Sequence, residues 1–349
     1  MGDHVRSYVV AHLPGDGIGP EVTAVARDLV DRAGKRHGFS IDWRDCPLGA
    51  GYYLRTGQVL PDEVLQDLRK TDAIMLGAVG SPSVPPGVLE RGLLLRLRFD
   101  LDLYVNLRPA RQRPGVDTAG ADDLDFVVVR ENTEGLYAGA GGIVHRGTAF
   151  ETATEESLNT RAGVERCVRY AAALAAKRTG KLTLVHKTNV LTNAGSLWMR
   201  VAQQVAAEQH VQLDYAHVDA ACLYMVSDPG RFDVIVTDNL FGDIITDLAA
   251  ALTGGLGLSA SGNLNPDKTG PSMFEPVHGS APDIVGTGKA NPAGAVLSAA
   301  LMLEHLGEPA AAVDLDSAVD AVLGAGGQPT TQAWAEALSA QLAHTEVTR

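Results

Sequence analysis

Cysteine and long apolar runs are scarce in this chain, and each shortage excludes a class of protein. The three cysteines, Cys46, Cys167 and Cys222, are widely spaced and form no C-x-x-C pair, so neither a disulfide framework nor a zinc site is expected. The longest apolar stretches, such as 295–303, fall far short of the ~20 residues that a membrane-spanning helix needs. No basic flank precedes an apolar core at the N-terminus, so we expect a cytoplasmic protein without a signal peptide.

Positive charge is also in deficit. The sequence has 29 Lys and Arg against 42 Asp and Glu, a formal net charge of −13. Because nucleic acids and anionic membranes are held by Lys and Arg, we expect neither as a partner. A small anionic substrate stays open, since a few local arginines outweigh a distant net charge at contact distance. The 349 residues, 45% hydrophobic and 20% charged, predict a folded chain long enough for two domains.

Strand-like and helix-like segments alternate along the chain, which predicts an α/β fold with a mostly parallel sheet. Apolar runs predict strands over 7–13, 73–76, 126–129, 182–185 and 234–237. Helical spacing of apolar residues predicts helices over 21–33, 161–178, 196–208 and 243–252. Two segments interrupt this alternation. The glycine-rich segment 135–150 predicts a protruding hairpin or arm, and 259–272, rich in Gly, Asn, Pro and Asp, predicts a loop.

The first predicted strand leads into the turn Gly-Asp-Gly-Ile-Gly-Pro at 15–20. A dinucleotide-binding turn needs glycine at its first, third and sixth positions, but the sixth residue here is Pro20. Two interpretations stay open at this point. The turn either binds a phosphate group or is a tight structural turn that leads into a helix.

Several arginines lie at or near the ends of predicted elements, namely Arg91, Arg96, Arg98, Arg108 and Arg130. Such arginines are usually solvated or salt-bridged. A guanidinium can also hold a carboxylate through two parallel hydrogen bonds, which lysine does less well. Three converging arginines would fit a substrate with two or more carboxylates.

Asp243 and Asp247 are four residues apart, so on a helix both face the same way. Two carboxylates ~4 Å apart repel by about 4 kcal/mol at a surface-like dielectric, and Mg²⁺ or Mn²⁺ would remove that repulsion. The alternative is acidic charge favoured by the dipole at a helix N-terminus. Asp219 would strengthen the metal interpretation if the fold brings it near. Beside a cation, Lys187 could act as a proton acceptor, with Tyr137 as a second proton-transfer group.

The stretch 275–284 contains two prolines and is typical of an ordered binding loop. An acidic residue that accepts hydrogen bonds from a ribose hydroxyl is how nucleotide sites select NAD over NADP. Asp283 could have this role. Alternatively, it caps a helix that begins at Ile284.

Taken together, these stretches resemble the isocitrate/isopropylmalate dehydrogenase family of β-decarboxylating dehydrogenases, and most closely its bacterial isopropylmalate branch. The motifs follow in the family's order at 15–20, 106–109, 186–189, 238–243, 278–283 and 290–292. The resemblance implies a two-domain fold that is not the standard Rossmann fold. A discontinuous NAD-binding domain would comprise 1–101 and 256–349, and 102–255 would form a second domain for dimerisation, with the metal site and an arm over 135–150.

The resemblance also implies roles for single residues. The substrate would be bound by Arg98, Arg108 and Arg130, together with Glu90, Leu93 and Leu94. Catalysis would involve Tyr137, Lys187 and Asp219. A Mg²⁺ or Mn²⁺ ion would be held by Asp243 and Asp247, with Asp219 reaching across the interface of a homodimer. NAD would contact Glu275, His278, Gly279, Ser280, Ala281, Asp283, Ile284 and Asn291, with Asn189 near the nicotinamide.

The implied reaction is the NAD-dependent and metal-dependent oxidative decarboxylation of a 2-hydroxy diacid. The apolar stretch 92–95 stands where isocitrate enzymes carry small polar residues, which favours 3-isopropylmalate as substrate and 2-oxoisocaproate as product, in leucine biosynthesis. However, 92–98 is one residue longer than in the commoner bacterial form, and 130–137 is similar to the isocitrate or homoisocitrate version. Homoisocitrate, isocitrate, tartrate or a specialised alkylmalate of secondary metabolism therefore stays open. An inactive structural or regulatory member is the less favoured alternative, because all the matching lysine, tyrosine and aspartate residues are present.

Overall fold

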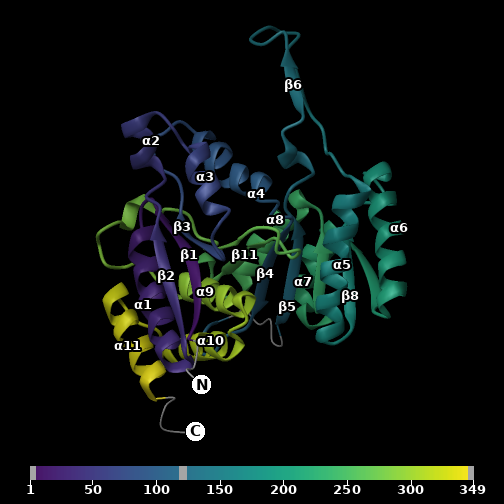
Figure 1. The fold of residues 1–349 in the computed structure, drawn as a ribbon. Helices are drawn as coiled ribbons and strands as arrows, with labels where there is room; N and C mark the ends of the chain where they lie inside the picture. Colours follow the sequence, from purple (N-terminus) through teal and green to yellow (C-terminus); the bar gives the residue numbers. More distant parts are fainter. Residues whose placement is uncertain (1–4, 118–123, 345–349) are drawn as a thin grey trace. The chain divides into compact units, whose positions relative to one another are not determined.

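The computed structural model describes residues 5–117 and 124–344, as an α/β protein (Figure 1). The chain forms two compact units. Unit 1 comprises Met1–Leu103, Arg111–Gly120 and Ala250–Arg349, and unit 2 comprises Tyr104–Ala110 and Ala121–Ala249. Within the described ranges, no helix combines the length and the apolar character that crossing a membrane requires.

The strands of unit 1 follow the order β2-β1-β3-β12-β11. Pairing is parallel among β2, β1, β3 and β12, whereas β11 and β12 are antiparallel. Every residue of β3 is buried, as expected for a central strand covered on both faces. The bounds are β1 Arg6–Gly15, β2 Phe39–Asp45, β3 Ala73–Ala78, β11 Ala260–Leu264 and β12 Ser272–Pro276.

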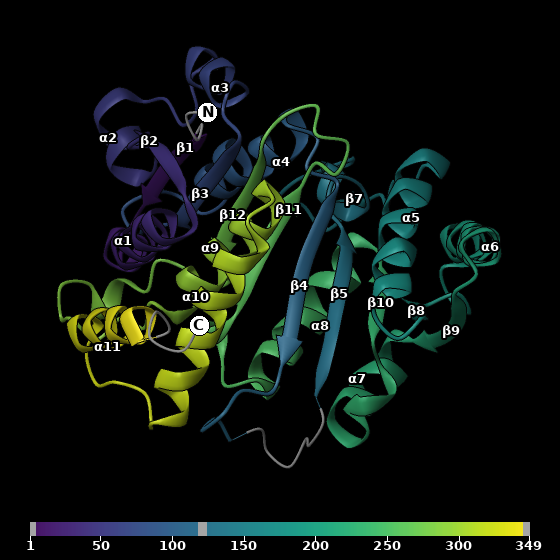
Figure 2. The same cartoon turned by 60° about the horizontal axis from the view of Figure 1, so that its bottom comes forward.

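Four long helices belong to unit 1: α1 Gly19–His37, α9 Ala293–Leu306, α10 Pro309–Gly324 and α11 Thr331–His344 (Figure 2). Helix α9 is buried along most of its length and packs against α1, α10 and three strands of the sheet. Its lack of a polar face explains the apolar run at 295–303. Shorter helices are α2 Ala50–Thr56, α3 Asp62–Leu68 and α4 Arg96–Asp100, with 3₁₀ turns at Leu256–Leu258 and Pro282–Ile284.

A single π-helical turn, Glu90–Leu95, leads directly into α4. A π-turn closes its hydrogen bonds one residue later than an α-turn, so it holds an extra residue without breaking the helix, and such turns are frequent at functional sites. The turn overlaps the stretch 92–98, for which the resemblance implied one extra residue. Leu93 is 0% exposed and packs into a core cluster with Leu97 and Leu101, whereas Leu94 is only partly buried against that cluster.

The strands of unit 2 follow the order β4-β5-β10-β8-β9, and β5, β10, β8 and β9 pair in parallel. Helix α5 packs against β5, β8 and β10, and α6 packs against α5, β8 and β9. A separate antiparallel hairpin is formed by β6 and β7. The strand bounds are β4 Val105–Arg111, β5 Asp125–Glu131, β6 Gly141–Val144, β7 Thr152–Glu155, β8 Lys181–His186, β9 Gln212–His217 and β10 Val234–Thr237. The helices are α5 Arg161–Lys177, α6 Thr192–Gln209, α7 Val218–Ser227 and α8 Asn239–Leu252, with 3₁₀ turns at Leu136–Ala138 and Pro229–Arg231.

The nine predicted strands and helices are confirmed, with bounds that differ by a few residues. The hairpin predicted at 135–150 is present but extends further along the chain, with β6 inside that segment and β7 beyond it. The predicted loop at 259–272 is wrong. It contains all of β11 and the first residue of β12. Its small polar residues are buried instead of exposed: Ser261 and Asn263 are both 0% exposed, and Asn263 donates a hydrogen bond to Glu275 at 2.8 Å. A buried strand can carry such residues when their polar groups are hydrogen-bonded.

The glycine-rich turn between β1 and α1 uses its backbone donors within the protein. Asp16 N–H donates to Ala78 at 2.7 Å, Ile18 N–H to Ser280 at 2.9 Å and Gly19 N–H to Asp16 at 3.0 Å. A phosphate-binding turn needs such N–H groups directed at its ligand. The structure therefore favours the second interpretation, a structural turn. This turn supports the loop that contains Ser280.

Backbone atoms pack so closely around Gly19 that this position has no room for a side chain. A β-carbon at this position would lie 2.2 Å from the Pro14 carbonyl oxygen and 2.7 Å from the Ala78 nitrogen, both backbone atoms. We expect Gly19→Ala to destabilise the protein by about 1–3 kcal/mol, the typical cost of overpacking. Gly51→Ala is the matched control, because its β-carbon would meet nothing within 4 Å on helix α2. That change should raise stability by up to ~1 kcal/mol. Urea denaturation of both variants tests this, and equal stabilities would contradict it.

Candidate active site

The carboxyl ends of three neighbouring parallel strands in unit 2 carry two groups of predicted site residues, Arg130 with Tyr137 and Asp243, and Lys187 with Asp219. Thr237 at the end of β10 lies in register with Arg130 of β5 and with Val185 of β8. Lys187 follows β8 directly, and α8 begins two residues after β10 ends. Ligands of α/β proteins commonly bind at this edge of a parallel sheet.

Arg130 lies together with two other predicted residues, Asp243 and Tyr137. Its guanidinium is 1% exposed, and Nη1 lies 2.5 Å from Oδ1 of Asp243. The Tyr137 hydroxyl donates to Oδ2 of the same carboxylate at 2.7 Å. Nε of Arg130 donates to Asn239 at 3.0 Å. The predicted substrate arginine, proton donor and metal ligand therefore form one contiguous polar cluster.

Arg108, on β4, is fixed by neighbours on two elements. Its Nε donates to Oδ1 of Asn106 at 2.9 Å, and Nη1 donates to the Thr246 hydroxyl on α8 at 3.2 Å. Thr246 lies between Asp243 and Asp247 in the sequence of α8. Arg108 is therefore held beside the helix that carries the two predicted metal ligands.

Lys187 and Asp219 form an ion pair, with Nζ 2.8 Å from Oδ1. Asp219 is in the first turn of α7, and its side chain is 68% exposed, whereas that of Lys187 is 25% exposed. The hydrogen bond from Lys187 lowers the pKa of the Asp219 carboxyl below its ordinary value, which keeps this carboxylate ionised. Two predicted catalytic residues are thus adjacent within one chain.

The acidic residues offer the oxygen donors that Mg²⁺ and Mn²⁺ prefer. Asp243 is half-buried and Asp247 is exposed one turn further along α8. Neither is in the first turn of the helix, which removes the dipole alternative. Among the described residues, no three His, Cys, Asp or Glu side chains are grouped to hold a metal ion. A metal held by Asp243 and Asp247 would therefore need further ligands from a substrate, water or another chain.

Three buried ionisable residues form a second row behind the cluster, one at the end of each strand: Glu131, Asp238 and His186. Nε2 of His186 lies 3.6 Å from Oδ2 of Asp238. Burial raises the pKa of Asp238 to about 6 and lowers that of His186 to about 4. Burial also raises the pKa of Glu131, whose carboxylate accepts hydrogen bonds from Thr133 and from the backbone of Glu134. Through these hydrogen bonds, Glu131 supports the segment that leads to Tyr137.

Unit 1 carries the third predicted arginine. Arg98 on α4 is 8% exposed, and its Nη2 lies 3.3 Å from Oε1 of Glu275 on β12. Glu90 is exposed at the start of the π-turn. Leu94 belongs to the π-turn that precedes Arg98 and is partly buried against the core cluster. Leu93 is directed into the core instead.

The predicted cofactor loop follows β12 in unit 1. His278 has a buried Nε2 with no hydrogen-bond partner among the described residues, and burial lowers its pKa. Gly279 is exposed, and a β-carbon there would meet nothing within 4 Å. Ala281 has a left-handed φ of 41°, an unusual conformation for a residue with a side chain. A buried nitrogen that lacks a hydrogen-bond partner among the described residues, next to a glycine with free space around it, would suit a polar ligand such as a nucleotide.

The remaining predicted cofactor residues are placed as follows. Ser280 and Ile284 are half-buried, and Ser280 contributes the carbonyl that Ile18 contacts. Asp283 is exposed, and no side-chain cap is made at the 3₁₀ turn Pro282–Ile284. Asn291 accepts a hydrogen bond from the Ala293 N–H at the start of α9, at 2.9 Å. Asn189 belongs to unit 2 and is exposed just after Lys187.

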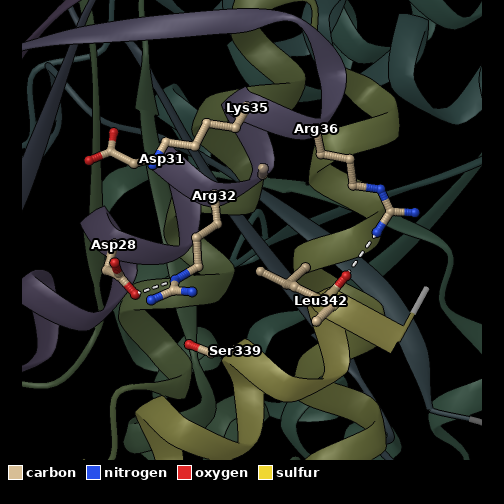
Figure 3. Close-up of a pocket in the computed structure, with 9 residues that line it drawn as sticks. Asp28, Asp31, Arg32, Lys35, Arg36, Ser339 and Leu342 are labelled. Atoms are coloured by element: carbon tan, nitrogen blue, oxygen red, sulfur yellow. Dashed lines mark hydrogen bonds and ion pairs between the residues drawn. The ribbon is translucent and has the colours of Figure 1, made fainter. Parts of the chain in front are cut away.

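A pocket of about 470 Å³ lies elsewhere in unit 1, between α1 and α11 (Figure 3). Several of its charged side chains already have partners. Arg32 bonds Asp28 at 2.7 Å, and Arg36 donates to the Leu342 carbonyl at 3.0 Å. None of the predicted site residues lines it.

Comparison with known proteins identifies the family. A model of the isocitrate/isopropylmalate dehydrogenase family matches residues 9–347. The chain belongs to this family. The 3-isopropylmalate dehydrogenase of Thermobifida fusca (strain YX) is 60% identical to it over 320 residues, 90% of each chain. That of Mycobacterium avium (strain 104) is 56% identical over 338 residues, 95% of this chain and 99% of the relative. Among solved structures, isocitrate dehydrogenase from Methylococcus capsulatus superposes with a TM-score of 0.87 at 38% identity, covering 96% of this chain and 99% of that one.

Membership of the isocitrate/isopropylmalate dehydrogenase family makes the chain a decarboxylating dehydrogenase.

Several residues of its candidate site were not among our predictions. Asn239 holds Arg130, Thr246 holds Arg108, and Asn263 holds Glu275. Asn239 stands in a family motif that we quoted, so its position in the sequence could have indicated it. Thr246 and Asn263 carried no such signal.

Burial of Asp238 predicts a specific pH dependence of stability. Because its pKa is about 6 in the folded protein and 3.8 ordinarily, its contribution to stability is complete below pH 3.8 and is lost as the pH rises through about 6. We expect Asp238→Asn to match the wild type near pH 4 and to exceed it at pH 8 by about 1–3 kcal/mol. Denaturant unfolding between pH 4 and 8 measures this.

Asp233 is the control for the sign of this effect. Its carboxylate is bonded by Arg178 and Thr179, and its pKa is lowered. Stability from Asp233 is therefore present at neutral pH and lost on acidification, so Asp233→Asn should destabilise at pH 7 and less at low pH. A loss of stability at pH 8 in Asp238→Asn as well would contradict our assignment of Asp238.

Proposed function

We propose that this chain catalyses the NAD-dependent oxidative decarboxylation of 3-isopropylmalate to 2-oxoisocaproate in leucine biosynthesis. Identity of 55–60% with several 3-isopropylmalate dehydrogenases over about 90% of the chain supports this substrate. The single structural observation that carries the proposal is the cluster of Arg130, Tyr137 and Asp243. It combines a group for binding a carboxylate, a proton donor and a metal ligand within hydrogen-bond distance.

Substrate binding would use the three buried or partly buried arginines. Arg108 and Arg130 are each fixed by two neighbours, so little side-chain freedom remains to be lost when a carboxylate binds. Arg98, which belongs to unit 1, would also bind a substrate carboxylate. Leu94, which is only partly buried in the π-turn before Arg98, would contact the apolar substituent of the substrate.

A divalent metal ion would be held by Asp243 and Asp247, with Asp219 as the third acidic ligand. When bound, Mg²⁺ or Mn²⁺ supplies Lewis-acid stabilisation of charge on the substrate's C2 oxygen. Asp243 is half-buried and is hydrogen-bonded through both carboxylate oxygens, so its orientation is fixed before any ligand arrives. Asp247 is exposed and able to adjust.

Proton transfer would divide between two residues. Lys187 would accept the proton of the substrate's 2-hydroxyl group; NAD⁺, when bound, would supply the acceptor for the hydride of C2, and CO₂ would leave from the neighbouring carbon. Tyr137 donates a proton to that carbon as the new C–H bond forms. Its hydroxyl is oriented by Asp243 and its ring lies 5.0 Å from the Arg130 guanidinium carbon. The loop 277–291 and Asn189 would bind NAD.

The ion pair between Lys187 and Asp219 bears on the proposed homodimer. Because the two side chains are 2.8 Å apart in one chain, a subunit that contributes Asp219 to its partner's metal site would also contribute Lys187 to that site. Active sites would then be completed only on association. Exposed apolar residues on α7 and α8, Leu223, Val226 and Ile244, support a partner-covered surface there.

The function is tested by a panel of 2-hydroxy diacids with NAD⁺ and Mn²⁺, in which NADH formation is followed. We expect the highest kcat/KM with 3-isopropylmalate, above isocitrate, homoisocitrate and tartrate. A higher kcat/KM with any of these three would overturn the substrate and keep the reaction class. Absence of turnover with every diacid would favour a structural or regulatory role.

Lys187→Met should fold and bind Mn²⁺ yet lose nearly all turnover, by about 10²–10⁴-fold, because a proton acceptor is removed. Lys177→Met, at the exposed end of α5, is the matched control and should keep full activity. Circular dichroism checks folding, and initial rates of NADH formation measure activity. Wild-type turnover in Lys187→Met would exclude the assigned role.

The π-turn predicts that two adjacent leucines respond differently to truncation. Leu93→Ala should cost about 2–5 kcal/mol of stability, since Leu93 is fully buried in the core. Leu94→Ala should cost much less stability but should lower the preference for 3-isopropylmalate over malate by roughly 10–200-fold, as loss of an apolar contact does. Unfolding curves and kcat/KM for the two substrates measure this. An unchanged preference in Leu94→Ala would exclude it from the substrate contact.

A further inference from the structure

A polar face in unit 1 lies directly beside the predicted substrate arginine. Glu275 is 9% exposed on β12, and Asn263 is 0% exposed on the antiparallel neighbour β11. Asn263 pairs with Met273, two residues before Glu275, so the side chains of Asn263 and Glu275 are diagonal neighbours on one face of the sheet. Met273 belongs to the same core cluster as Leu97 of α4. This face of the sheet therefore supports the helix that carries Arg98.

Three side chains are connected in series on this face. Asn263 Nδ2 donates to Oε1 of Glu275 at 2.8 Å, and Nη2 of Arg98 lies 3.3 Å from the same oxygen. The side chains of Arg98 and Glu275 are only 10% and 11% exposed. A buried charge without a partner is strongly unfavourable, so the Glu275 carboxylate is what allows the Arg98 guanidinium to lie there.

The contact leaves most of the hydrogen-bonding capacity of Arg98 unused. A guanidinium has five N–H donors. Glu275 is the hydrogen-bond partner of Arg98 within the described part of the chain, through Nη2 alone and at a long distance. Its buried Nε has no partner there. Donors remain for a carboxylate that binds with two parallel hydrogen bonds.

Structural arginines of the same unit are bonded quite differently. Arg111 and Arg113 bond two aspartates of α10, Asp316 and Asp320, through four contacts of 2.6–2.9 Å. Such saturated pairing fastens a segment and leaves little capacity for a ligand. The single long contact of Arg98 orients its side chain while its other donors stay available.

We propose that Glu275, itself held by Asn263, is a positioning residue that orients Arg98 toward a substrate carboxylate. This rests on the proposed function, in which Arg98 binds the diacid. The family resemblance assigned Glu275 to the cofactor. Its hydrogen-bond contacts with Arg98 and Asn263 support a role at the substrate arginine, through which it would act, in addition to that expectation.

A double-mutant cycle on the full-length protein tests the proposal. The variants are Glu275→Gln, Arg98→Lys and the combination, and the readout is the Kd of 3-isopropylmalate by calorimetry with Mn²⁺ and without NAD⁺. Loss of a hydrogen bond between charged groups predicts a Kd raised on the order of 10–100-fold in Glu275→Gln. In the Arg98→Lys background, the same change should raise Kd by less than about threefold, since the group on which it acts is already altered. Glu63→Gln, on the exposed face of α3, is the matched control and should leave Kd unchanged.

Kinetics provide the second readout. In Glu275→Gln we expect KM for the diacid to rise while kcat stays within about threefold of wild type. Equal increases in Kd in both backgrounds would overturn the proposal, as would a rise in KM for NAD⁺ with an unchanged Kd for the diacid. If Glu275→Gln does not fold by circular dichroism, Asn263→Ala replaces it, with a smaller increase in the same direction; an unchanged Kd in that variant would also overturn the proposal. Turnover of 3-isopropylmalate by the wild type is measured first, so that failure of the proposed function is recognised separately.

Discussion

The close approach of Arg130 to helix α8 constrains the rest of the candidate site. A β-carbon on Gly242 would lie 2.4 Å from Cγ of Arg130, so the arginine side chain occupies the space that any other residue would fill. This packing places the guanidinium against Asp243, and Asp243 in turn orients the Tyr137 hydroxyl. Because Arg130 is the penultimate residue of β5 and Gly242 is in α8, one contact fixes the helix with the proposed metal ligands relative to the strand with the proposed substrate arginine.

The glycine-rich turn of unit 1 illustrates how a motif can support a binding loop without touching its ligand. Its N–H groups are used by Ala78 and Ser280, and the Asp16 carboxylate accepts hydrogen bonds from Ala50 at 2.8 Å and Gly80 at 3.0 Å. Asp16 thereby connects the segments that follow β2 and β3. The proline in place of a sixth glycine fits this role, because Pro20 starts α1 and no ligand needs its N–H.

Much of the fold followed from periodicity, because alternating buried strands and amphipathic helices leave a strong pattern. β11 did not, since its buried Ser261 and Asn263 resemble loop residues until their hydrogen bonds are known. In the site, helical spacing alone indicated Asp243 and Asp247. Lys187 and Asp219 are 32 residues apart and required the family resemblance, because spacing cannot show that two segments meet. The row of Glu131, Asp238 and His186 depends on strand register, which the sequence does not express.

Charged residues of the candidate site share a property that shapes how ligands would bind. Arg130 is paired with Asp243, Lys187 with Asp219, and Arg98 with Glu275, each within its own unit. A substrate carboxylate or a metal ion must therefore share or replace an existing partner, and its affinity reflects only the difference between the two interactions. Arg98 makes a single long contact and keeps donors for a carboxylate that binds beside Glu275, whereas Nε and Nη1 of Arg130 are both engaged at 3.0 Å or less. We therefore expect the orientation of Arg98, in addition to its charge, to determine how tightly a diacid is bound.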